Sequence, residues 1–290
     1  MRLFLGMCVL FTLPIWANTQ ITTQIHDIDH GDNLADEVLV YLTSGKVVKF
    51  NVNDTETLEK LNNSLLMKKW LKLDISNDRY IESAVEVAPV LPQVDPEKLK
   101  MSHEKSLMSM DPLEGYNASV ITPELAKQAF SEMRHPSKEE TQCFNRAMVW
   151  TYEMRVKHNI YSKKIYIFFT RNYIRRYNFD WWFHVSPMVN MIVDGQIKER
   201  TLDKKYSSGP LEIQKWANIF LSDDAKCPYV HTYSDHASYP EAGSCFFQKA
   251  PMYYYQPVDL EFLEKFGSVK NRWLESDVRA AYAEAFEIYP

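Results

Sequence analysis

Three residue types that can form a hydrolytic triad occur in order along the chain, as Cys143, His184 and Asp203. A thiolate is a strong nucleophile, an imidazole can take and return its proton, and a carboxylate can orient the imidazole. These three types also occur together by chance in most chains of this length. The surrounding sequence must therefore supply a reason for them to meet.

The cysteines single out Cys143. The sequence has four cysteines, of which Cys8 lies in an N-terminal segment that we expect to be removed. Cys227 and Cys245 lie in a loop-rich stretch and are the natural pair for a disulfide, which leaves Cys143 as the free thiol. A free cysteine can also act as a small buried hydrophobe, and that alternative stays open here.

Residues 1–17 are typical of a secretory signal peptide. Arg2 precedes a short apolar run, a helix-breaking Pro14, and a small Ala17 after which cleavage can occur. The apolar run is short for a membrane span, and no later segment reaches the roughly 20 apolar residues that a transmembrane helix needs. We expect a secreted or periplasmic protein without a stable membrane anchor.

Composition argues against one class of partner, and one acidic stretch raises the question of a metal. The net charge is −5 and the chain has no basic low-complexity run, which argues against nucleic acid as a partner. The stretch from His26 to Asp32 alternates acidic residues with histidines and could suggest a metal site. A solvated, flexible N-terminus is the preferred interpretation, so we expect no metal and no cofactor.

Two segments precede the presumed site. Residues 18–85 suggest a small α+β pro-region, with a hairpin at 38–42 and 47–52, a helix from residue 54 to about 70, and a strand at 71–75. Residues 86–121 lose periodicity and gather prolines and lysines, which suits a linker with an activation cleavage site. An ordinary interdomain spacer is the alternative.

Residues 122–290 form the predicted catalytic domain, of α+β class. Thr122-Pro123 caps one helix. Ser137-Lys138-Glu139-Glu140 is a capping-box pattern that predicts the start of the helix carrying Cys143. Strands follow, and Asp194-Gly195 is a strong signal for a two-residue hairpin turn. With that turn, His184 and Asp203 share one face of the hairpin as diagonal neighbours, roughly 7–8 Å apart at the backbone and within side-chain reach.

At these residues the chain resembles the bacterial protein-glutaminase family of secreted protein-glutamine deamidases. The matching pieces are Cys143-Phe144-Asn145-Arg146-Ala147, Trp182 to Val185, Arg200-Thr201-Leu202-Asp203, Ser207-Ser208-Gly209-Pro210, and Trp216. The resemblance implies a Cys-His-Asp triad on a core like that of papain and transglutaminase. It also implies glutamine-bearing protein or peptide substrates, and a pro-region that inhibits the enzyme until it is cleaved. Lys204 departs from the family, where a proline is expected, and residues after 220 match poorly.

Several functional alternatives remain at this stage. A papain-like peptidase or a transglutaminase-type acyltransferase uses the same triad order, and a binding protein could keep a vestigial triad. The Cys143 backbone N–H is the default donor for an oxyanion. Trp181 and Trp182 are candidate walls of a substrate pocket, although one of them is expected to face the core.

Overall fold

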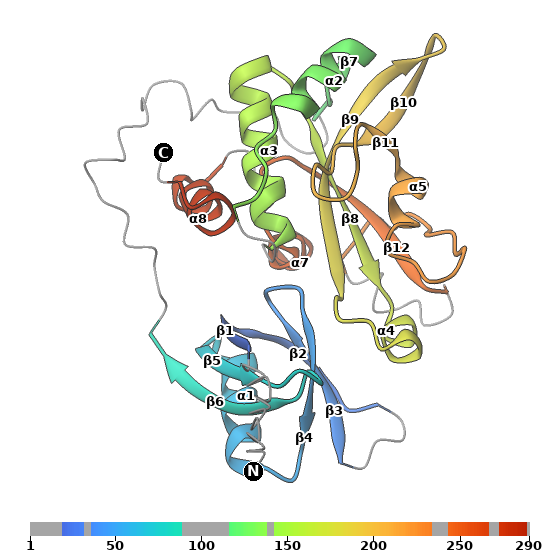
Figure 1. Ribbon diagram of the computed structural model, residues 1–290. Coiled ribbons are helices and arrows are strands. Elements are labelled where there is room, and N and C mark those ends of the chain that lie inside the picture. Colours follow the sequence, from blue (N-terminus) through green and yellow to red (C-terminus); the bar gives the residue numbers. More distant parts are fainter. Residues whose placement is uncertain are drawn as a thin grey trace, which may run out of the picture. The chain divides into compact units, whose positions relative to one another are not determined.

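Figure 1 shows a computed structural model, which describes residues 19–31, 36–88, 116–137, 142–233, 243–266 and 273–288. The described chain is a mixed α/β structure whose strands form three sheets, with mostly antiparallel pairing. It divides into two compact units, Met1–Val40 with Val48–Ala88, and Tyr41–Val47 with Pro89–Pro290. The predicted signal peptide and most of the predicted linker lie outside the described residues.

The first unit contains one helix and most of two three-stranded sheets. One sheet has the order β1 (Thr19–Thr23), β5 (Trp70–Ile75), β6 (Ile81–Val87), and the other β2 (Ile25–Asp29), β3 (Glu37–Leu42), β4 (Val47–Asn51). Helix α1 (Thr55–Met67) begins after Asp54, whose carboxylate accepts a hydrogen bond from the Thr57 N–H at 3.1 Å. The predicted hairpin, helix and third strand are confirmed.

The predicted flexible N-terminus is wrong where the structure describes it. Residues 25–29 form strand β2, and Ile25, Ile28 and Asp29 are buried. The His26, Asp27 and Asp29 side chains therefore belong to a strand, whose successive residues point to opposite faces. Among the described residues, no cluster of three histidine, cysteine or acidic side chains suits a metal ion, and Asp32 lies outside the described residues.

The second unit is built on a sheet of six strands. Its order is β11 (Leu211–Glu212), β10 (Gln196–Thr201), β9 (Phe183–Val193), β8 (Lys163–Phe169), β12 (Cys245–Pro251), with β7 (Val120–Ile121) paired to β9. The helices are α2 (Pro123–Glu132), α3 (Cys143–His158), α4 (Arg171–Tyr177), α5 (Ile213–Ala217), α7 (Pro257–Phe266) and α8 (Glu275–Phe286). The strands and the Thr122 cap predicted from the sequence are confirmed.

Helix α3 lies against strands β9 and β8, and α8 packs on α3 (Figure 1). Its inward residues Ala147, Trp150 and Met154 are buried, as their helical spacing predicts. Trp150 and Met154 belong to a core that α2, β9, α8 and the residues just after β12 also line. No helix in the described part of the chain is long and apolar enough to cross a membrane.

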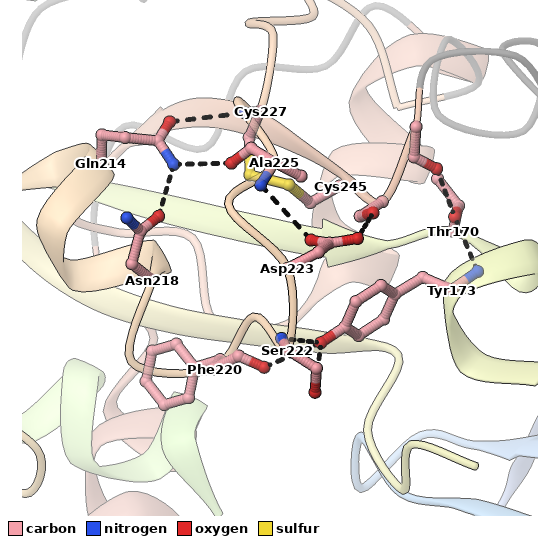
Figure 2. The surroundings of a disulfide bond; sticks show 12 residues. Thr170, Tyr173, Gln214, Asn218, Phe220, Ser222, Asp223, Ala225, Cys227 and Cys245 are labelled. Carbon is pink, nitrogen blue, oxygen red and sulfur yellow. Dashed lines mark hydrogen bonds between the residues drawn. A yellow bond between two sulfur atoms is a disulfide. The ribbon is translucent and has the colours of Figure 1, made fainter. Parts of the chain in front are cut away.

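The predicted disulfide between Cys227 and Cys245 is confirmed, and it joins the loop after α5 to the first residue of β12 (Figure 2). The cysteines are 18 residues apart, and a cross-link closing a loop of this size stabilises a fold by about 3 kcal/mol. Nearby, Tyr173 Oη donates to the Phe220 carbonyl at 3.1 Å and accepts from the Ser222 N–H at 2.7 Å. The loop that carries Phe220 is therefore held at several points.

Candidate active site

Cys143 is the first residue of α3, and its side chain is a free thiol at the edge of burial, 9% exposed. The capping-box prediction is wrong, because the residue that precedes α3 is Gln142 and the helix begins six residues after Ser137. The Ser137 N–H donates to the Ala285 carbonyl at 3.0 Å, and the other capping-box residues lie outside the described residues. A first-turn N–H has no acceptor inside its own helix, and helix N-termini favour negative charge. The observed start gives Cys143 both properties.

The hairpin β9–β10 brings His184 and Asp203 together. Val193 pairs with Gln196 across the Asp194-Gly195 turn, as the sequence predicted. His184 Nε2 lies 2.7 Å from Asp203 Oδ2, and both side chains are buried. The Cys143 side chain is close enough to His184 to raise the pKa of its imidazole. Because Nε2 faces the carboxylate, Nδ1 is the ring nitrogen left for the sulfur.

The Asp203 carboxylate has further donors that fix its orientation. Trp216 Nε1–H donates to Oδ2 at 2.9 Å, and the Lys205 N–H donates to Oδ1 at 3.3 Å. The Ser207 hydroxyl and N–H both donate to the Asp203 carbonyl at 2.9 Å. Hydrogen bonds thus hold both the carboxylate and the backbone of Asp203, and the carboxylate keeps one position.

An aromatic shell surrounds the His184 imidazole. Four rings lie within 6 Å of it by centroid distance: Phe220 at 4.6 Å, Tyr206 at 5.2 Å, Trp216 at 5.5 Å and Trp181 at 5.8 Å. The shell excludes water and strengthens the interaction of the imidazole with Asp203. Its cost is that a charged imidazole loses hydration.

The charges of the pair outweigh that cost. Burial lowers the pKa of His184, but the Asp203 carboxylate and the Cys143 side chain raise it, and the net pKa is raised. Burial raises the pKa of Asp203, but His184, Arg146 and Trp216 lower it, and the net pKa is lowered. The arrangement therefore favours an imidazolium beside an ionised carboxylate.

The two candidate pocket tryptophans lie in different surroundings. Trp181 is half-buried and stacks on His184 with an interplanar angle of 21°. Trp182 is buried among Phe168 and Phe183. Trp182 thus faces the core, as expected of one of the two, and Trp181 is the one beside the imidazole.

Lys204, which departs from the resembled family, has its own structural role. Its ammonium group donates to the Phe130 carbonyl at 3.1 Å and to the Ser131 carbonyl at 2.9 Å, near the end of α2. It also lies over the Phe130 ring at 5.2 Å. Lysine therefore ties the loop after Asp203 to α2, where negative partial charge gathers.

Sequence reasoning gave no role to four residues around the triad: Arg146, Tyr206, Trp216 and Phe220. Trp216 and Arg146 appeared only as parts of matching motifs. Tyr206 lies three residues after Asp203 in the same turn, with its N–H donating to the Asp203 carbonyl at 3.1 Å. Phe220 is placed by the disulfide-bonded loop, which no local sequence signal indicates.

Residues 122–220, which contain Cys143, His184 and Asp203, match a family model described as glutaminase. The matched segment makes up about a third of the chain. The resemblance found from the sequence is thereby confirmed. The glutaminase match ends at Phe220, at the point beyond which the sequence resembled the family poorly.

Solved structures of protein-glutaminases are also similar to the chain. A crystal structure of pro-protein-glutaminase has 13% identity and a TM-score of 0.45, covering 82% of this chain and 84% of that chain. A mutant of pro-protein-glutaminase has 13% identity and a TM-score of 0.48, covering 83% and 84%. The NMR structure of protein-glutaminase from Chryseobacterium proteolyticum has 16% identity and a TM-score of 0.33, covering 48% and 77%. The search of curated proteins gave no match.

Proposed function

We propose that this chain hydrolyses the side-chain amide of glutamine in proteins or peptides, giving glutamate and ammonia through a thioester on Cys143. The observation that carries the proposal is the His184–Asp203 pair, joined at 2.7 Å beside a free thiol at a helix start. All three residues lie inside the segment that matches the glutaminase family.

In the proposed first step, the Cys143 proton passes to His184 Nδ1 and the thiolate attacks the amide carbon of glutamine. The carbonyl oxygen gains the negative charge of the tetrahedral intermediate. The Cys143 N–H, which has no acceptor inside its helix, is the donor proposed for this oxyanion. Asp203 stabilises the imidazolium and holds its Nε2–H.

In the second step, His184 gives its proton to the departing nitrogen, which leaves as ammonia. The C–N bond breaks and the thioester remains on Cys143. Water then gives a proton to His184 and attacks the thioester, and the thiol is restored as glutamate leaves. The net reaction consumes one water for each amide and needs no cofactor.

The proposal also includes the type of catalytic core and the location of the protein. A cysteine-bearing helix packed on an antiparallel sheet, with histidine on a central strand, is the arrangement expected of a papain- or transglutaminase-like core. The charged start, apolar run and small residue of segment 1–17 support export to a secreted or periplasmic location.

The product distinguishes the proposed reaction from those of related enzymes. Incubation with a casein-like protein should release ammonia and convert glutamine to glutamate, seen by mass spectrometry as amide-to-acid changes at single sites. New peptide termini would instead indicate a peptidase, and crosslinked products a transglutaminase-type acyltransferase. Release of no ammonia, both before and after limited proteolysis, would leave the binding-protein alternative.

We further propose that the chain is made as an inactive precursor, with residues 18–85 as an intramolecular inhibitor. The turn Tyr41–Val47, which belongs to the second compact unit, supports this. Trp182 donates from its N–H to the Gly45 carbonyl at 3.0 Å and from its indole to the Leu42 carbonyl at 2.8 Å. Val47 donates to the Asp180 carbonyl at 2.8 Å. These contacts lie within four residues of His184.

Cleavage between residues 86 and 121 is therefore expected to raise ammonia release. Gly45→Ala should loosen the turn Tyr41–Val47, because Gly45 has φ +93° and an added Cβ would lie 3.1 Å from Phe183 Cε1. The activity of the uncut chain should therefore rise. Gly243→Ala is the matched control, since it has φ +80° but nothing within 4 Å of an added Cβ. Unchanged activity after cleavage between 86 and 121 would contradict the precursor proposal.

A further inference from the structure

Arg146 brings a permanent positive charge beside the proposed triad. It lies on α3, three residues after Cys143, and its side chain is 2% exposed. Its guanidinium carbon lies 5.8 Å from the centre of the Tyr206 ring and 6.0 Å from that of the Trp150 ring. Tyr206 in turn packs edge-on against His184 at 5.2 Å. Arg146 is therefore separated from the imidazole by one ring.

The charges around the guanidinium and the Tyr206 ring come from three parts of the unit. Cys143 precedes it on the same helix, and Asp203 and Tyr206 lie in the turn after β10. His184 and Asp180 lie on β9 and just before it. The pKa of Asp203 is lowered against burial by His184 first and then by Arg146. Burial raises the pKa of Tyr206 to about 12, and Arg146 opposes that rise. Arg146 thus interacts with the Asp203 carboxylate and with the Tyr206 ring that separates it from the imidazole.

A charge count shows when Arg146 matters. With Cys143 as thiolate and His184 as imidazolium, these two charges cancel, and Arg146 cancels Asp203. Once His184 has given its proton to ammonia and the sulfur is acylated, both are neutral. Of these four groups, only Asp203 and Arg146 are then still charged, and their charges are opposite. A buried carboxylate without a compensating cation is strongly unfavourable.

We propose that Arg146 is a positioning residue, which keeps Asp203 ionised while His184 is neutral and holds the Tyr206 ring against the imidazole. This role rests on the proposed deamidase function. Arg146 contacts no reacting atom in this scheme and acts through Asp203 and Tyr206. The planar guanidinium suits both tasks, because it stays charged when buried and stacks on aromatic faces.

The test compares Arg146→Met, Arg146→Gln and Arg146→Lys. The two neutral variants should lower kcat/KM for ammonia release by roughly 10- to 100-fold, the size expected for losing an interaction with a buried charge. Removing a nearby cation raises the pKa of both a carboxyl group and an imidazolium. Both limbs of their pH–rate profiles should therefore move up by about one pH unit. Arg146→Lys keeps the charge and should keep the limbs, with a lower rate because the planar stack is lost.

A merely structural role predicts a different result, namely a loss of activity and of thermal stability with the limbs unmoved. Unmoved limbs in a folded neutral variant, or moved limbs in Arg146→Lys, would overturn the proposal. Should neither neutral variant fold, Arg146→Lys still decides. Unmoved limbs with the thermal stability of the parent would support the proposal, whereas moved limbs, or unmoved limbs with lost thermal stability, would overturn it.

A second readout separates this inference from the deamidase function. The rate at which iodoacetamide alkylates Cys143 is measured against pH on the full chain, without any substrate. In a neutral Arg146 variant, the rise in rate that marks thiolate formation should occur at higher pH than in the parent. A parent chain that releases no ammonia yet shows this shift would refute the function and keep the role of Arg146. Normal ammonia release with no shift would support the function and refute the role of Arg146.

Discussion

Replacement of Cys143 by alanine is expected to lower ammonia release from a glutamine-containing protein by roughly 10⁴-fold or more, the scale found when a covalent nucleophile is removed. The reason is that no thioester can form, and the His184–Asp203 pair then has no sulfur to activate. Helix α3 should persist, since Cys143 is its first residue and alanine suits a helix. The measurement is ammonia release over time after limited proteolysis.

Two controls complete this experiment. Val156→Ala changes an apolar residue on the same helix that is 58% exposed, and it should retain parent activity. Iodoacetamide should label the parent at Cys143 near neutral pH, and His184→Ala should slow that labelling because the imidazole no longer takes the proton. Full amidase activity in Cys143→Ala would show that another group performs the chemistry.

The pairing of histidine with aspartate was predictable because it depends on a short-range signal. Asp194 and Gly195 both adopt positive φ, 51° and 73°, as a tight hairpin turn requires. Once the turn is fixed, the register of β9 with β10 leads the chain back so that Asp203, two residues past the end of β10, reaches His184. The geometry was therefore contained in about 20 consecutive residues, a range over which local rules hold.

The start of the cysteine helix was not predictable from the same kind of signal. Ser137 to Glu140 has the capping-box pattern, yet the helix begins after Gln142, and Ser137 donates to the Ala285 carbonyl on α8. A contact with a helix more than a hundred residues away thus replaces a local cap. The consequence is functional, because the helix then begins at Cys143 itself.

The groups around the triad were missed for a related reason. Trp216, Phe220 and Arg146 come from α5, the loop after it and the buried side of α3. Each meets His184 or Asp203 only after the sheet and helices have packed. Strand β2 was missed because its polar residues alternate irregularly, and its burial comes from pairing with β3.

Replacement of Asp203 by asparagine is expected to lower kcat by roughly 10³-fold or more, the range seen when a triad carboxylate is neutralised. Asp203 Oδ2 accepts from both His184 Nε2 and Trp216 Nε1. The asparagine oxygen can occupy that position, which keeps the imidazole in place, but its amide then faces the Lys205 N–H, another donor. The variant thus loses the charge that stabilises the imidazolium rather than the geometry.

The pH profile tests this explanation. In the parent, the carboxylate raises the pKa of His184 against the opposing effect of burial, so the alkaline limb lies above the ordinary histidine range. In Asp203→Asn burial is no longer opposed by that charge, and the alkaline limb should move to lower pH.

Trp216→Phe is the matched comparison, because it removes one donor to the same oxygen but keeps a ring near His184. It should cost about 10- to 100-fold, the value of one hydrogen bond to a charged group. Its alkaline limb should not move down, since a carboxylate with fewer donors attracts the imidazolium more strongly. Equal losses in both variants, with the same limb positions, would mean that Asp203 acts only by packing. The charge of Asp203 would then have no part in activating Cys143.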